Sequence, residues 1–177
     1  MRIVLLAASL TLLAACGGPE TSQANISNSA APVATAAASV VTAKVSGEDA
    51  AKVMHERHEG MEAIGKANKA IKRELGGDAP DLGVVRSSAA KIAGLSQKAS
   101  GWFPAGTGPD VAKTGAKPEI WQNLADFTAK LRNFQKAAQA FNAAASGANV
   151  NTIKARFADL GGACKACHDK YRTEMKH

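Results

Sequence analysis

Residues 162–172 read Gly-Ala-Cys-Lys-Ala-Cys-His-Asp-Lys-Tyr-Arg and contain the pattern Cys-x-x-Cys-His. Cys164 and Cys167 stand at positions i and i+3, which lie on the same face of a helix. Both thiols could therefore reach the two vinyl groups on one edge of a porphyrin. His168 follows one turn after Cys164 and could place its imidazole under the ring to bind iron. This is the c-type haem attachment sequence, and it predicts one covalently bound haem c.

A Cys-x-x-Cys pair also occurs in thiol–disulfide redox centres and as half of a zinc site. A zinc site would need a second pair of ligands, and the sequence offers no such pair. A thioredoxin-like centre would lie in a βαβ unit, and no part of the sequence has that pattern. The haem interpretation is therefore preferred to both.

The composition of the 177-residue chain favours one helical domain. The chain is rich in alanine, with only five Phe, two Trp and one Tyr, and its formal charge is +7. The basic residues are spread along the predicted helices and aromatic residues for base stacking are few, so no nucleic-acid partner is expected. A basic face toward an acidic redox partner or anionic lipid is compatible with the charge, although a solvated helix surface is the simpler explanation.

The N-terminus predicts export. Residues 1–15 begin with a positive charge and continue as an apolar run that is too short to span a bilayer as a mature helix. The stretch Leu13-Ala14-Ala15-Cys16-Gly17 resembles the bacterial lipobox, in which the cysteine becomes the lipidated first residue. We expect residues 1–15 to be a lipoprotein signal peptide and Cys16 to carry a lipid anchor. By analogy the protein is expected in the periplasm, anchored to the outer membrane; an ordinary secretory signal with an incidental cysteine is the alternative.

The next segment, residues 16–46, contains mostly Ala, Ser, Thr, Asn and Pro, with little charge and no long apolar periodicity. Such a segment cannot bury enough apolar surface to order itself. It is predicted to be a flexible tether, followed by a folded domain over residues 47–177.

Apolar residues then recur at helical spacing in four segments. These segments cover approximately residues 47–76, 81–99, 118–146 and 149–171. The Gly- and Pro-rich residues 101–117 are expected to form a packed crossing loop, with Trp102 and Phe103 folded back on the helices. Four helices joined mostly by short turns predict an all-α, antiparallel, up-down-up-down four-helix bundle.

Both haem cysteines fall on the apolar face of the last segment, so the haem is expected inside the bundle. Gly161 and Gly162 interrupt that helix at a cost in stability, and we expect the porphyrin to approach closely there. On the first segment the apolar face includes two polar residues, Arg57 and Asn68, which an ordinary core would avoid.

Residues 162–172 resemble the haem segment of the cytochrome c′ family, the class II c-type cytochromes. Trp102-Phe103-Pro104 and residues 116–121 are similar to its mid-chain segments, and Arg57 followed four residues later by Met61 is similar to its first helix. The similarity covers about residues 48–175. A Cys-x-x-Cys-His near the C-terminus also argues against the class I cytochromes, which carry it near the start.

The resemblance implies a four-helix bundle, often a homodimer, with His168 as the proximal iron ligand. It matches Arg172 with a family arginine near the haem, and Arg57 with a position on the first helix that faces it. A charged residue on an apolar helix face needs a partner, and a haem propionate would supply one. The alternative for Arg172 is a solvated arginine near the end of the chain.

The resemblance also places Met61 at the distal position, where the family divides. Members with an apolar residue there have five-coordinate iron that takes NO or CO, whereas members with Met have six-coordinate iron suited to electron transfer. We therefore expect His168 and Met61 as axial ligands and single-electron exchange with periplasmic or membrane redox proteins. The alternative is a gas-binding protein that scavenges or buffers NO, and Met61 would then be ordinary core packing.

Other assignments are less favoured. Met54, His55 and His58 are weaker candidates for the distal ligand because of their positions relative to the apolar face. No nucleophile–base pair, paired acids or phosphate loop is recognisable, so we expect an electron-transfer protein and not an enzyme. A structural lipoprotein with incidental haem is a third hypothesis.

Overall fold

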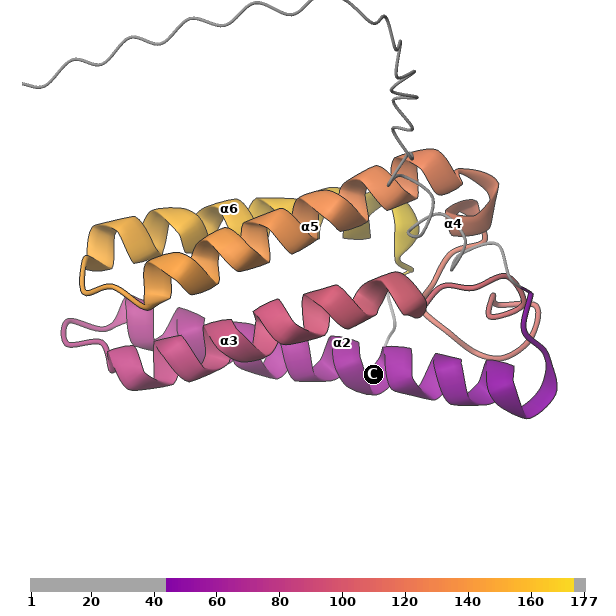
Figure 1. Ribbon diagram of the computed structural model, residues 1–177, viewed down its shortest axis with the longest axis horizontal. Helices are drawn as coiled ribbons and strands as arrows, with labels where there is room; N and C mark the ends of the chain where they lie inside the picture. Colours follow the sequence, from indigo (N-terminus) through magenta and orange to yellow (C-terminus); the bar gives the residue numbers. More distant parts are fainter. Residues whose placement is uncertain (1–43, 174–177) are drawn as a thin grey trace, which may run out of the picture. The chain divides into compact units, whose positions relative to one another are not determined.

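The computed structural model describes residues 44–173 (Figure 1). The four long helices are α2 (Gly47–Gly76), α3 (Leu82–Lys98), α5 (Leu124–Ala145) and α6 (Val150–Tyr171), with the short η1 (Ala99–Gly101) and α4 (Glu119–Gln122) between α3 and α5. Successive long helices run antiparallel (Figure 1), so the predicted all-α four-helix bundle is confirmed. The predicted signal peptide, Cys16 and nearly all of the predicted tether lie outside the described residues. No helix within residues 44–173 is long and apolar enough to cross a membrane.

Local sequence sets the helix ends close to the predicted positions. Asp81 caps α3 by accepting hydrogen bonds from the backbone N–H groups of Gly83 and Val84. Asn149 caps α6 by accepting one from Thr152 N at 3.0 Å. The third predicted helix differs, because Asn123 (φ −129°, ψ 48°) leaves the helical conformation and separates α4 from α5. Its side-chain amide donates to Glu119 O at 3.1 Å, which is the kind of local bond that competes with helix geometry.

The core lies between the helices, and all four long helices contribute to it. The prediction agrees best with the structure on α5. The predicted apolar face of that helix is buried almost throughout: Phe127, Leu131, Phe134, Ala138, Phe141 and Ala145. On α2 the agreement is weaker, because Gly60 and Ala67 are buried whereas Met61 and Asn68 are only half-buried. The helical period was therefore predicted correctly, and the buried face differs from the predicted one by one residue at these two positions only, since Met54, Arg57, Ile64, Ile71 and Leu75 are buried.

The loop after η1 packs against the bundle, as predicted. Trp102 and Phe103 are buried. Trp102 lies so close to α2 that a Cβ added to Gly60 would be 2.2 Å from its Cη2 atom. Two further hydrogen bonds hold the loop in place, from Val45 N to Ala105 O at 2.8 Å and from Trp121 Nε1 to Pro104 O at 3.1 Å.

Three sides of the bundle are closed by helix packing and one is not. α2 packs on α3, α3 on α5 and α5 on α6, whereas α2 and α6 hardly touch. The fourth side, between α2 and α6, therefore has space for something other than a helix.

Candidate functional site

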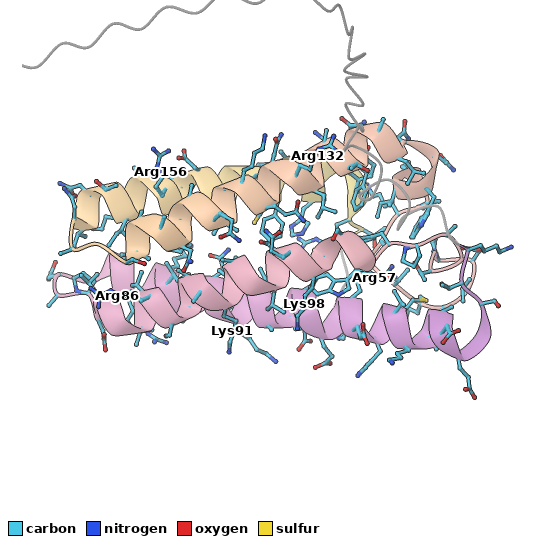
Figure 2. The ribbon with its side chains drawn as sticks, viewed as in Figure 1. Arg57, Arg86, Lys91, Lys98, Arg132 and Arg156 are labelled. Carbon is cyan, nitrogen blue, oxygen red and sulfur yellow. The ribbon has the colours of Figure 1, made fainter. Side chains whose placement is uncertain are left out.

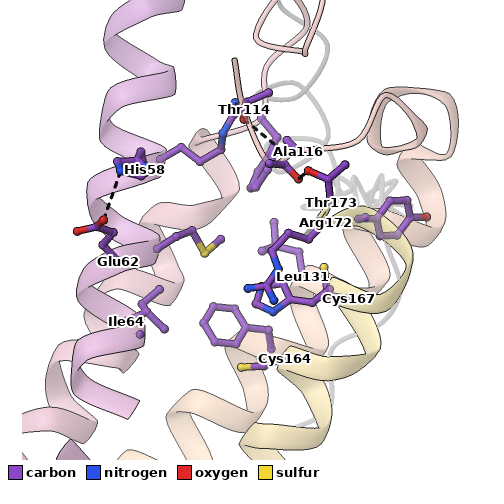
Figure 3. Close-up of a pocket in the computed structure, with 18 of the residues that line it drawn as sticks. His58, Glu62, Ile64, Thr114, Ala116, Leu131, Cys164, Cys167, Arg172 and Thr173 are labelled. Atoms are coloured by element: carbon purple, nitrogen blue, oxygen red, sulfur yellow. Dashed lines mark hydrogen bonds and ion pairs between the residues drawn. The ribbon is translucent and has the colours of Figure 1, made fainter. Parts of the chain in front are cut away.

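A cavity of about 1070 Å³ occupies this open side, at the upper end of the range of about 300–1,000 Å³ that is usual for ligand sites. Figure 3 shows Cys164 and Cys167 on α6, with Ile64 and His58 on α2 across the cavity. The inner wall is apolar and comes largely from α5: Phe127, Leu131 and Phe134. Loop residues 113–116 close one end.

Cys164, Cys167 and His168 all line the cavity from α6 and are half-buried, so the structure brings together the three residues of the predicted attachment motif. Burial raises the pKa of the Cys164 thiol and raises the pKa of Cys167 to about 11. A redox-active thiol pair needs a lowered pKa, so this environment argues against a thiol–disulfide centre. The described residues also bring no further His, Cys, Asp or Glu close enough to these cysteines to complete a zinc site.

His168 is suited to binding a metal. Burial lowers the pKa of its imidazole, and the nearby charge of Arg172 lowers this pKa further, while Asp169 acts in the opposite direction. The neutral form, which has a free nitrogen lone pair for a metal, is therefore favoured at pH 7.

The α2 wall opposite His168 is formed by apolar side chains, Met54, Met61 and Ile64. Met61 is half-buried and Met54 is buried. His58 lies at the edge, with its side chain 56% exposed and its Nε2 atom 3.4 Å from Glu62 Oε1. His55 is exposed and does not line the cavity. Met61 is thus placed on the wall that the resemblance implies, and its binding to iron stays a prediction.

Arg57 is buried, with 5% of its surface exposed, and it lines the cavity. Its two terminal nitrogens donate to the crossing loop: Nη1 to Trp102 O and Thr107 Oγ1, and Nη2 to Thr107 O and Thr114 Oγ1. Burial lowers its pKa to about 10, so it still carries its charge at pH 7. The loop oxygens thus supply hydrogen-bond partners that the sequence did not indicate. The predicted contact of Arg57 with a haem propionate stays a prediction.

Arg172 also lines the cavity with an exposed side chain, and its contact with a haem stays a prediction. Its backbone belongs to an isolated antiparallel bridge with Ala116. Lys117 N donates to Tyr171 O at 3.0 Å and Thr173 N to Gly115 O at 2.9 Å. The end of α6 that carries His168 is therefore tied to the same loop that holds Arg57.

Gly161 and Gly162 are exposed, and a Cβ added to either would have no atom within 4 Å. Neither glycine is among the residues that line the cavity. The predicted close approach of a porphyrin to them stays a prediction.

The sequence analysis did not single out a cluster beside the site. Tyr171 lines the cavity and donates its hydroxyl to Asp126 Oδ2 at 2.5 Å. Its ring packs edge-on against Phe127, which packs edge-on against Phe103. The helical periodicity of α5 predicted Phe127 as a core residue, but no pattern links Asp126 to a residue that is 45 positions away.

These residues fit a covalently attached haem. Two thiols and an uncharged imidazole lie on one wall, the inner and opposite walls are apolar, and the open side of the bundle supplies the volume. A haem is flat and apolar and carries two anionic propionates. These propionates would suit the entrance of the cavity, which has exposed lysines: Lys66, Lys69, Lys72 and Lys113.

Comparisons with known proteins agree with this arrangement. The family model described as Cytochrome C′ matches residues 52–172. Cytochrome c′ from Allochromatium vinosum is 33% identical over 141 residues, which are 78% of this chain and 89% of that protein.

Two solved structures add information about ligands. A cytochrome c′ described as having an unusual ligand-controlled dimer dissociation is 30% identical, with a TM-score of 0.67, and covers 73% of this chain and 100% of its own. The nitric oxide complex of a leucine-to-isoleucine variant of cytochrome c prime from Alcaligenes xylosoxidans is 28% identical, with a TM-score of 0.62. The match covers 75% of this chain and 99% of that protein. The relatives therefore include a dimeric protein and a protein that binds nitric oxide.

Proposed function

This chain belongs to the cytochrome c′ family, and we propose that it carries one haem c and binds a diatomic gas, NO or CO, in the cavity between α2 and α6. Cys164 and Cys167 would hold the haem through thioether bonds, and His168 would bind its iron from the α6 side. When bound, the haem would supply an iron able to bind the gas, and Met54, Met61 and Ile64 would line the space that faces it. The observation that carries the proposal is the large apolar cavity with the attachment motif on one wall.

The chemistry of the α2 wall supports a small, weakly polar ligand. Polarity and hydrogen-bond donors on the distal side of a haem decide which ligands it takes. Met54, Met61 and Ile64 supply no strong donor, and both terminal nitrogens of Arg57 are already bonded to the loop. Among the described α2 residues that line the cavity, Asn68 is the half-buried side chain that still offers a donor. The nitric oxide complex of a relative supports the same ligand class. We therefore place the gas-binding hypothesis ahead of the His/Met electron carrier that the sequence analysis preferred.

Electron transfer with Met61 as the sixth ligand is the second candidate function. One observation favours it: Met61 lines the cavity from the wall opposite His168. If its sulfur bound the iron, no position would be left for a gas, and the protein would exchange single electrons at a six-coordinate haem.

Optical spectra of the haem-loaded protein, oxidised and reduced, with and without CO, separate the two functions. Gas binding predicts a high-spin spectrum that shifts at once when CO is added to the reduced protein, in the wild type and in Met61→Leu alike. Met54→Leu is the matched control, because Met54 lines the same cavity from the same helix. A low-spin spectrum that CO does not change, and that becomes CO-sensitive in Met61→Leu only, would replace this proposal with the electron carrier.

We propose further that the chain is exported to the periplasm and anchored through a lipid on Cys16, with residues 16–46 as the tether. A Cys16→Ser variant should move from the membrane fraction to the soluble periplasmic fraction with its haem intact. If Cys16→Ser fractionates like the wild type, the lipid anchor is wrong.

A further inference from the structure

Charge is distributed unevenly around the cavity. Five cationic side chains that line it are exposed, and we call them the cationic rim: Lys66, Lys69, Lys72, Lys113 and Arg172. Glu62 is the one carboxylate among the described residues that line the cavity, and it is already 3.0 Å from Lys66. The two propionates of a bound haem would offset part of this charge, but the entrance would stay positive.

Most of the rim has no ion partner within the described chain. Lys66 pairs with Glu62, whereas Lys69, Lys72 and Lys113 form no ion pair within residues 44–173. The same is true of Lys91, Lys98 and Lys136 on other faces, so the absence of a partner is not what sets the rim apart. Its distinction is that five exposed cations and a single carboxylate surround one opening. Like charges gathered in this way repel one another and add nothing to the stability of the fold, so their position at the entrance suggests an anionic partner outside the chain.

We propose that the cationic rim is a docking surface for an acidic protein that exchanges single electrons with the haem. The inference rests on the proposed haem site and goes beyond gas binding, because it assigns a partner to the entrance. The haem would supply an iron that can change by one electron: a reduced partner would lose one electron to it, or an oxidised partner would take one from it. The step makes or breaks no covalent bond of the chain.

Electrostatics gives such a rim a kinetic role. Cations around a concave opening raise the local concentration of anions and speed their association by about 10- to 1,000-fold at low ionic strength. The effect is screened over a Debye length of about 8 Å at 0.15 M salt. The rim would therefore determine how fast an acidic partner reaches the haem edge rather than how tightly it binds.

An acidic protein fits this surface better than an anionic membrane does. Peripheral membrane binding combines basic residues with exposed apolar side chains that enter the headgroup region. Among the described residues, Val111 is the one large apolar side chain that counts as exposed, at 48%, and it does not line the cavity. The rim is therefore charged without an apolar component.

Stopped-flow oxidation of the reduced, haem-loaded full chain tests the proposal. The probes are ferricyanide, an anionic acceptor, tris(phenanthroline)cobalt(III), a cationic acceptor, and polyglutamate as an acidic competitor. The rim variant is Lys69→Gln/Lys72→Gln/Lys113→Gln. The control removes the same charge at exposed positions outside the cavity, with Lys91→Gln/Lys98→Gln/Lys136→Gln; Figure 2 shows Lys91 and Lys98 on α3.

We expect the rim variant to react with ferricyanide about tenfold more slowly than wild type at low ionic strength, and faster with the cobalt complex. High salt should remove both differences. Polyglutamate should slow the wild type and the control but not the rim variant. If the control slows as much as the rim variant, net charge is responsible and the docking surface is refuted. Equal rates for all three proteins refute it as well.

Binding to phosphatidylglycerol vesicles tests the alternative that the cationic rim binds a membrane. If only the rim variant loses vesicle binding while its oxidation rates match wild type, the rim binds a membrane and the proposal is overturned. CO spectra of the same samples keep the two proposals separate. A failure to bind CO in every variant would count against the gas-binding function and leave the oxidation rates interpretable.

Discussion

Gly60 is the position at which α2 has least space for a side chain. A Cβ there would lie 2.2 Å from Cη2 and 2.4 Å from Cζ2 of Trp102, which is buried against the helix. Trp102 O also accepts a hydrogen bond from Arg57, so the ring cannot move without disturbing the loop. We therefore expect Gly60→Ala to force Trp102 and its loop outward.

The magnitude follows from two opposing effects. Replacing a helical glycine by alanine stabilises a helix by about 0.5–1 kcal/mol. Forcing an extra carbon into a packed site costs about 1–3 kcal/mol. Gly60→Ala should therefore lose on the order of 1–2 kcal/mol. Gly94→Ala on α3 is the control, because its Cβ meets no atom within 4 Å and should gain about 0.5–1 kcal/mol.

Guanidinium unfolding of the haem-loaded variants, followed by far-UV circular dichroism, measures both values. Helix propensity is the same for the two substitutions, so their difference reports the contact with Trp102. If Gly60→Ala is as stable as Gly94→Ala, the packing of Trp102 on α2 that defines this end of the bundle is wrong.

Three further changes test single contacts. Arg57→Met should lower the free energy of unfolding by about 3 kcal/mol in the same experiment, because the substitution leaves buried carbonyl groups of the loop without a donor. A loss below about 1 kcal/mol would show that the loop does not depend on Arg57. Asp81→Ala removes the cap of α3 and should cost about 1 kcal/mol, whereas Ser46→Ala should change little because Ser46 makes no capping bond. Hydrogen bonds from Tyr171 and Lys170 lower the pKa of the Asp126 carboxyl in the folded protein. These bonds therefore stabilise the fold fully above about pH 3.9, the usual pKa of an aspartate in an unfolded chain, and the stabilisation is lost as the pH falls through the lower pKa of the folded protein. Tyr171→Phe should therefore be destabilised at pH 7 and approach wild type in acid, and a gap in free energy of unfolding that does not narrow between pH 6 and 3 would contradict this assignment.

The open side of the bundle explains why the fold and the cofactor are linked. Helices of a bundle are stabilised mainly by burying their apolar faces against neighbours. α2 and α6 hardly touch, and the apolar residues between them face the cavity. The group that fills this cavity therefore completes the core.

Some features could not be predicted from local patterns because they depend on distant backbone. The partners of Arg57 lie 45 to 57 positions away, and only the folded loop brings their oxygens to the guanidinium. A charge on an apolar helix face indicates that it needs a partner, but the local pattern does not show that the loop supplies four of its hydrogen bonds.

The sequence by itself determined the four helices, most of their ends and the residues that would hold a haem. It could do so because helical period, capping residues and the Cys-x-x-Cys-His spacing are local properties, set by contacts within one or two turns. The tertiary structure alone decided which sides of the bundle close, where the cavity opens and which charges gather at its entrance. These depend on how α2, α6 and the crossing loop meet in space, and residues such as Lys72 and Lys113 become neighbours of one cavity only after the chain has folded.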